Sequence, residues 1–303
     1  MTKFKLGMNT YFAVKRWPEP EIWMKMVKKD FGLDVAQFDL DLLDPRTTEP
    51  ARSMQAQKIK ENAEKYKVKI QGTFTGGVGY HQSLLLHPHY EMRVDALDWF
   101  LNGVIIAQKI GAESFGAIYG ALSVADFADE KKKNHLITEL KYALHVIAKS
   151  AKAAGLKYIL IEPSPVPREI PSSLDEAIRL YDFFNEDSPL PIEYLFDVGH
   201  ACSYLAKDNE SDPYLWIRKI GKLCKAIHLQ QTNGKGDCHW SFTKENNKMG
   251  IIDAKKVIDT VASTGAKEMY LIFELVHAFE AYEPNVFDQV RESVEYWQKA
   301  LSK

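Results

Sequence analysis

The sequence is poor in cysteine, nearly neutral and free of long apolar runs. Its three cysteines, Cys202, Cys224 and Cys238, form no CxxC pair and no disulfide framework, which favours a reducing compartment. The formal net charge is -2, so no global field would attract a polyanion. No stretch approaches the roughly 20 apolar residues of a membrane span, and the N-terminal residues contain no signal-peptide core. We therefore expect a cytoplasmic protein with neither a nucleic-acid nor a membrane partner.

Two nucleotide-binding motifs are also absent. No GxGxxG follows a strand-like run and no GxxxxGK[ST] loop occurs, so neither a dinucleotide site nor an ATP site is indicated. The composition is that of a folded protein, with 46% hydrophobic and 26% charged residues. Two domains would fit into 303 residues, but one α/β barrel also reaches this length and no low-complexity linker divides the chain. We expect a single domain over residues 1–303.

Strand-like runs and helical patterns alternate along the whole chain. The expected strands are residues 5–12, 33–40, 68–74, 113–118, 157–162, 192–197, 226–229 and 269–274. The expected helices include residues 18–29, 51–66, 91–110, 132–154, 213–221, 252–264 and 284–301, and residues 77–89 and 230–249 are expected to be loops. Eight such units predict a (β/α)8 TIM barrel, with an open doubly wound sheet as the alternative.

Four of the expected strands end in a residue that can bind a metal. Glu162, Asp197, His228 and Glu274 end the fifth, sixth, seventh and eighth strands, and His200 follows Asp197 by three residues. The carboxyl ends of parallel strands meet at one mouth of a barrel, so these side chains should converge there. Carboxylates with one imidazole suit Mn²⁺, Mg²⁺, Co²⁺ or Zn²⁺. We expect one divalent metal ion at this mouth.

This order of residues resembles the xylose-isomerase-like barrel superfamily. The group includes ketose 3-epimerases of the tagatose and psicose type, other sugar isomerases and the endonuclease IV repair enzymes. The resemblance covers nearly the whole chain and is strongest from Glu162 to Glu274, where the order Glu, Asp-x-x-His, His, Glu is kept. It implies the same four metal ligands. It also relates Asp237-Cys238-His239 to the D-x-H element that binds a further metal, together with His200, in endonuclease IV.

The resemblance leaves a sugar enzyme and an apurinic-site endonuclease as alternatives. The nuclease needs two more histidines after early strands; His81 matches one, but the fourth strand ends in Ala117-Ile118-Tyr119-Gly120 without a histidine. The sugar enzyme is therefore preferred, with Asp237 and His239 binding substrate or a weak second metal. A barrel that has lost its chemistry is a third hypothesis, and the retained ligand types argue against it.

The preferred function is a metal-dependent epimerase or isomerase of a ketose. In the epimerases that the resemblance implies, two glutamates, here Glu162 and Glu274, move a proton on opposite faces of one carbon through an enediolate. His200 would bind the substrate O2, His81 would cover the substrate, and Trp240 is a candidate for stacking on the sugar.

The sequence departs from the epimerase pattern at two positions. Those enzymes often carry an Arg six residues after the metal His and a second Glu six residues after the first Glu; here these positions are Gly234 and Arg168. Arg168 and Lys235 place cations in mouth loops, which favours an anionic substrate such as a short ketose phosphate, for example a tetrulose phosphate. Family relatives are often dimers or tetramers, so a homodimer or homotetramer is possible.

Overall fold

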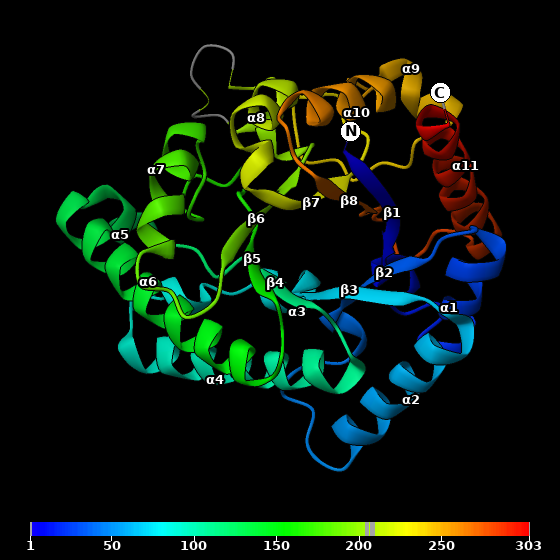
Figure 1. The fold of residues 1–303 in the computed structure, drawn as a ribbon. Helices are drawn as coiled ribbons and strands as arrows, with labels where there is room; N and C mark the ends of the chain where they lie inside the picture. Colours follow the sequence, from blue (N-terminus) through cyan, green and yellow to red (C-terminus); the bar gives the residue numbers. More distant parts are fainter. Residues whose placement is uncertain (1, 204–205, 207–209, 303) are drawn as a thin grey trace.

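In the computed structural model, eight parallel strands pair side by side in chain order, and β8 pairs with β1 to close the ring (Figure 1). The structure describes residues 2–203, 206 and 210–302. The strands are β1 (Lys3–Asn9), β2 (Val35–Asp39), β3 (Lys69–Phe74), β4 (Ser114–Ala117), β5 (Tyr158–Ile161), β6 (Ile192–Asp197), β7 (Cys224–Leu229) and β8 (Glu268–Phe273). The predicted (β/α)8 barrel is confirmed.

The longer helices surround the ring on its outside, whereas the short helix α3 lies at the mouth of the barrel (Figure 1). The helices are α1 (Pro20–Lys25), α2 (Ala51–Tyr66), α3 (Gly76–Tyr80), α4 (Tyr90–Ile110), α5 (Val124–Ala128), α6 (Glu130–Ala153), α7 (Leu174–Asn185), α8 (Pro213–Ile220), α9 (Lys244–Met249), α10 (Ala254–Ser263) and α11 (Glu283–Leu301). The long helices bury one apolar face against the strands, as in α6 with Leu136, Leu140 and Leu144. Their starts follow local signals: the Ser173 hydroxyl accepts a hydrogen bond from the Glu176 N–H at the first turn of α7.

Two short helices lie where the sequence predicts loops. Helix α9 is polar and buries none of its residues, so it has no apolar periodicity that could reveal it. Helix α3 is rich in glycine, and its first N–H groups, from Gly77 and Val78, donate to the carboxylate of Asp41 in the loop after β2. A cap supplied by a distant residue leaves no local sequence signal.

The first strand is shorter than predicted. It ends at Asn9, whose side-chain oxygen accepts a hydrogen bond from the Tyr11 N–H at 2.7 Å. That bond starts a 3-10 turn over Thr10–Ala13 instead of continuing the strand.

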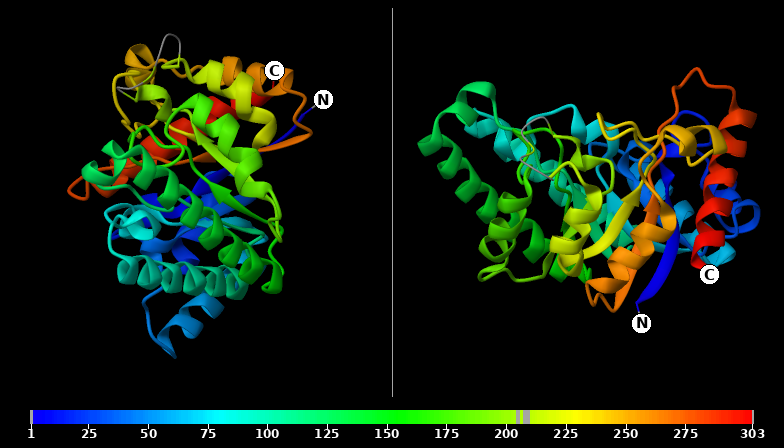
Figure 2. Two further views of the ribbon diagram at one scale, coloured as in Figure 1. Left: turned by 90° about the vertical axis from the view of Figure 1, so that its left-hand side faces the viewer. Right: turned by 90° about the horizontal axis from the view of Figure 1, so that it is seen from above.

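Polar side chains close the N-terminal end of the barrel. Lys69 Nζ lies 2.5 Å from Glu113 Oε2 and donates to the Tyr270 hydroxyl at 2.7 Å, and that hydroxyl donates to Glu113 at 3.1 Å. Both chain termini lie near this end, on the side away from the strands' carboxyl ends (Figure 2). Within the described residues, no helix has the length and apolarity needed to cross a membrane.

Candidate metal centre and active site

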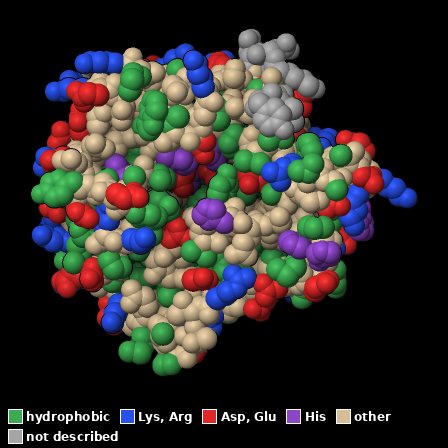
Figure 3. Space-filling model, turned by 180° about the vertical axis from the view of Figure 1, so that it is seen from behind, with side chains coloured by type: hydrophobic (Ala, Val, Ile, Leu, Met, Phe, Trp, Pro, Cys, Tyr) green, Lys and Arg blue, Asp and Glu red, His purple; other side chains and the backbone are tan. Residues whose placement is uncertain are grey.

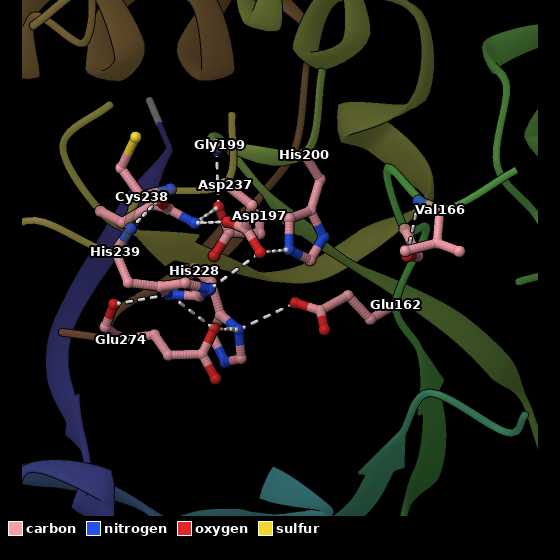
Figure 4. A network of polar contacts seen from close by, with 12 residues as sticks. Glu162, Val166, Asp197, Gly199, His200, His228, Asp237, Cys238, His239 and Glu274 are labelled. Atoms are coloured by element: carbon pink, nitrogen blue, oxygen red, sulfur yellow. Dashed lines mark hydrogen bonds and ion pairs between the residues drawn. The ribbon is translucent and has the colours of Figure 1, made fainter. Parts of the chain in front are cut away.

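The pairing register of the second half of the barrel brings the four predicted ligands together. Asp197 ends β6 and is the Cα partner of His228 on β7. Glu162 and Glu274 each follow the last residue of their strands, β5 and β8. One ligand atom from each of the four residues lies within 4.8 Å of the others (Figure 4). All four side chains are buried, as a cluster of charged groups at the floor of a barrel mouth requires.

His228 stands between the two glutamates. Its Nδ1 lies 3.0 Å from Glu162 Oε1 and 2.9 Å from Glu274 Oε2 (Figure 4). Burial alone would lower the pKa of His228, but the two carboxylates outweigh it and raise that pKa to about 10. Burial alone would also raise the pKa of Glu274, but His228 and His239 lower it to about 2. Without a metal, the Nδ1 proton of His228 therefore occupies the place between the two carboxylates.

Asp197 supplies the clearest test of whether a cation fits. Its Oδ1 accepts hydrogen bonds from the Gly199 N–H at 2.6 Å and from Gln230 Nε2 at 3.0 Å. Its Oδ2 is buried without a hydrogen-bond partner in the described part of the chain. Burial raises the pKa of Asp197 to about 7, against the effect of His200 and His239. A buried carboxylate oxygen that lacks a partner is costly, so the cluster fits a divalent cation bound by this oxygen.

A second group of possible ligands lies beside the first. Asp237 Oδ2 lies 3.4 Å from His200 Nε2 and 3.1 Å from His239 Nε2. Burial alone would raise the pKa of Asp237, but the two imidazoles hold it well below its usual range. The other nitrogen of His200 lies 2.9 Å from the Pro163 carbonyl oxygen and therefore carries a proton. His200 is thus oriented from the loop after β5 and directs Nε2 toward the mouth.

The Gln230 amide connects the two groups. Its Nε2 donates to Asp197 and also to Asp237 Oδ1, at 2.5 Å. Its oxygen accepts from the N–H groups of Cys238 and His239. This amide packs directly against the Cα of Gly199, where a Cβ would come within 2.3 Å of Gln230 Cδ. The glycine of Asp197-Val198-Gly199-His200 is therefore required by space.

The mouth contains a cavity of about 250 Å³ above these groups. Four further predicted site residues, His81, His200, Asp237 and His239, line it together with Glu162 and Glu274. Figure 3 shows the corresponding hollow, with histidine and acidic side chains gathered in it. The remaining lining residues are Tyr11, Phe74, Thr75, Gly76, Gly77, Tyr80, Ile118 and Val276.

Three of the predicted substrate-binding residues do not line this cavity. Arg168 Nη1 donates to the Leu122 carbonyl at 2.9 Å, and Lys235 is exposed in the loop after β7. Trp240 pairs through its backbone with Gln231. Their proposed contacts with an anion or with the sugar stay predictions.

One buried carboxyl near the site was not among the predicted residues. Glu169 is 6% exposed and accepts a hydrogen bond from the Ser164 hydroxyl. Burial raises its pKa to about 7, against the effects of Ser164 and His200. The only sequence signal for Glu169 is that it directly follows Arg168, and Arg168 occupies the position at which epimerases of the resembling type carry a glutamate. The proline-rich loop hides which of the two neighbours points inward.

The chain matches one family and several known proteins over nearly its full length. The sequence model of the xylose isomerase-like TIM barrel family matches residues 28–300. A D-erythrulose 1-phosphate 3-epimerase of Brucella abortus is 26% identical over 296 residues, which cover 96% of this chain and 94% of that protein.

Solved structures give the same picture of the fold. The crystal structure of a putative xylose isomerase from Rhodospirillum rubrum has a TM-score of 0.92 and 28% identity, covering 98% of this chain and 99% of that one. D-psicose 3-epimerase from Clostridium cellulolyticum, solved with D-tagatose, has a TM-score of 0.73 and 14% identity over 98% and 99% of the two chains. The second likeness concerns the fold alone.

Proposed function

The chain belongs to the xylose isomerase-like TIM barrel family, and we propose that it is a divalent-metal-dependent epimerase of a ketose or a short ketose phosphate. The related D-erythrulose 1-phosphate 3-epimerase supports this class of substrate. An aldose–ketose isomerase would use much the same groups, so the position of the mobile proton distinguishes the two reactions.

One observation carries the proposal: Glu162 and Glu274 approach a single ring nitrogen of His228 from two separate strands (Figure 4). Both also line the cavity in which a sugar would lie. Two carboxylates that flank one point can reach the two faces of a carbon held between them. Transfer of a proton from one face to the other inverts that carbon, which is the chemistry of an epimerase.

The residues then have separate tasks. A divalent ion held by Glu162, Asp197, His228 and Glu274 would polarise the ketose carbonyl and stabilise the negative charge that develops on its oxygen. Glu274 removes the proton from the adjacent carbon, and Glu162, carrying a proton at that stage, delivers it to the other face. The low pKa of Glu274 keeps this group ionised at neutral pH, as a base must be. In the reverse direction the two glutamates exchange roles, since each then starts in the protonation state that the forward reaction left it in.

His200 completes this arrangement. Burial alone would lower its pKa, but Asp237, Asp197 and Glu162 raise it well above the ordinary value. These carboxylates favour a proton on Nε2, which faces Asp237 Oδ2 at 3.4 Å and could donate a hydrogen bond to the substrate O2. His81, Asp237 and His239 line the same cavity, where they would contact the remaining hydroxyl groups. An anionic end of the substrate would be bound by the loop cations Arg168 and Lys235.

The test is proton exchange in D₂O, followed by NMR, with Mn²⁺ and a panel of ketoses and ketose phosphates. We expect deuterium at one carbon next to the carbonyl, together with the inverted product. Glu162→Gln and Glu274→Gln should each slow exchange by about 10²–10⁴-fold. Glu268→Gln is the matched control, because Glu268 lies at the opposite end of β8 and pairs with Lys5. Absence of exchange with every substrate would refute the proposal.

The apurinic-site endonuclease remains the second candidate, because His200, Asp237 and His239 form a second possible ligand group. Nicking of duplex DNA at an abasic site, with three divalent ions bound per chain, would establish it in place of the epimerase. We expect a single tightly bound ion and no nicking.

A further inference from the structure

We propose that Asn9 and Gln37, on the first two strands, fix the proton of His228 on Nε2, so that Nδ1 is the nitrogen that binds the metal. They would be positioning residues, because neither is among the metal ligands or lines the mouth cavity. The inference rests on the metal site of the proposed function. It adds a device that selects one of the two ring nitrogens.

The argument starts from a backbone group whose role as donor is certain. The Tyr11 N–H donates to Asn9 Oδ1 at 2.7 Å, so the oxygen of this amide points toward Tyr11. The other end of the same amide must then be the NH₂ group. It lies 3.0 Å from Gln37 Oε1 and donates to it.

The Gln37 amide is oriented by this donor. Its oxygen accepts from Asn9, while its nitrogen faces Gln71 Oε1 at 3.4 Å. The same Gln37 oxygen lies 2.7 Å from His228 Nε2. A carbonyl oxygen only accepts, so Nε2 must carry a hydrogen to avoid repulsion at this distance.

Water cannot relax this requirement, because the three side chains are buried inside the barrel. The exposed fraction is 1% for Asn9 and 0% for both Gln37 and His228. The ring is also packed on one side: Phe74 meets it edge-on, with 5.0 Å between the ring centroids. Rotating the imidazole by half a turn would leave the buried Gln37 oxygen without its donor, which is unfavourable.

With Nε2 protonated, the lone pair available to a cation is on Nδ1. This is the nitrogen that faces Glu162 and Glu274 at 3.0 and 2.9 Å. A hydrogen bond from the remote ring nitrogen to an oxygen also makes a ligand imidazole more basic and holds its plane. Asn9 on β1 and Gln37 on β2 thus orient the imidazole of His228, which lies on β7.

Two substitutions at position 37 separate this role from simple packing. Gln37→Met keeps the length of the side chain but removes the acceptor, and it should weaken Mn²⁺ binding by about 10–100-fold. Gln37→Glu keeps an acceptor toward both Asn9 and His228, and it should keep the affinity. If Gln37 only filled space, the buried charge of glutamate would be the worse change of the two.

A substitution at Asn9 should reverse the direction of the hydrogen bonds that connect Asn9, Gln37 and His228. Asn9→Asp keeps the acceptor for the Tyr11 N–H but offers no donor to Gln37. The Gln37 amide then gains by turning its NH₂ group toward the new carboxylate and toward His228 Nε2. That places the ring proton on Nδ1, where the metal must bind, so Mn²⁺ affinity should fall by at least about tenfold. Thr73→Val is the control, since the buried Thr73 hydroxyl has no hydrogen-bond partner in the described part of the chain.

Calorimetry with Mn²⁺ measures the affinities, and ¹⁵N NMR of the Zn²⁺-loaded protein identifies the nitrogens, because only Nε2 couples to both ring protons. We expect a proton on Nε2 and Zn²⁺ on Nδ1 in the native protein. Zn²⁺ on Nε2, or native affinity in Gln37→Met, would overturn this inference while leaving the epimerase intact. A native protein that binds neither ion would overturn the metal-dependent function and this inference together.

Discussion

The contact between Gly199 and Gln230 permits a demanding test of the site's architecture. The backbone at Gly199 has a φ of -81°, which alanine adopts without strain. Only space opposes Gly199→Ala: the new Cβ would lie 2.3 Å from Gln230 Cδ, 2.4 Å from Nε2 and 2.7 Å from Oε1. Contacts below 3.0 Å are not tolerated, so the amide would have to retreat by about 1 Å.

The size of the effect follows from what the amide holds. Gln230 makes four hydrogen bonds, to two carboxylates and from two backbone N–H groups, and it is 0% exposed. A retreat of that size would break about two of them. Each is worth about 1–3 kcal/mol when a charged group is involved, so the free energy of unfolding should fall by about 3 kcal/mol. Mn²⁺ binding should weaken as well, because Asp197 loses a donor that orients it.

Urea denaturation followed by circular dichroism measures this loss. Gly236→Ala is the matched control, because a Cβ there meets no atom within 4 Å, and it should change stability by less than about 1 kcal/mol. The double variant Gly199→Ala/Gln230→Ala should be no less stable than Gln230→Ala alone, since the clash has been removed. Unchanged stability of Gly199→Ala, or simple additivity in the double variant, would refute the reasoning.

Three further predictions concern the metal and the substrate. The glutamates hold the pKa of His228 at about 10 and burial holds that of Asp197 at about 7, so Mn²⁺ must displace at least one proton when it binds. The apparent affinity for Mn²⁺ should therefore rise at least about tenfold per pH unit between roughly pH 6 and 8. Calorimetry in buffers of different ionisation enthalpy measures the protons released, and a release of none would contradict this prediction. Mn²⁺ at about 100 times its Kd should add about 2.7 kcal/mol to the free energy of unfolding of chelator-treated protein, and Asp197→Asn should lose most of that gain in urea titrations. Lys235→Gln and Arg168→Gln should raise KM about tenfold for a ketose phosphate and leave KM for the free ketose unchanged; equal changes for both substrates in steady-state assays would remove the anion-binding role.

The strands that carry the site could be predicted because their sequence signals are local. Each of the apolar runs before Glu162, Asp197, His228 and Glu274 ends in one polar residue, and parallel strands place such ends on one rim. The bulk of every strand and long helix follows in the same way from hydrophobic periodicity. These parts of the chain need no knowledge of distant contacts.

The rest depends on contacts between residues far apart in the chain. Whether Arg168 or Glu169 points inward is decided by the path of a proline-rich loop and by Ser164, which bonds to Glu169. The role of Gln37 is equally invisible, because a glutamine within an apolar strand gives no sign that it faces an imidazole 191 positions away. Helix α3 likewise depends on Asp41, which belongs to the preceding βα unit.

The metal ligands and the residues that align them come from opposite halves of the chain, and this determines when the protein can bind its ion during synthesis. All four proposed ligands come from β5 to β8, and their alignment to β1 and β2 comes through the closure of β8 on β1 and through Gln37. A chain still growing toward β8 has neither the full ligand set nor a closed ring. The ion would therefore stabilise the completed barrel and would not nucleate its folding. A chain should therefore bind the metal ion only after its ring of eight strands has closed.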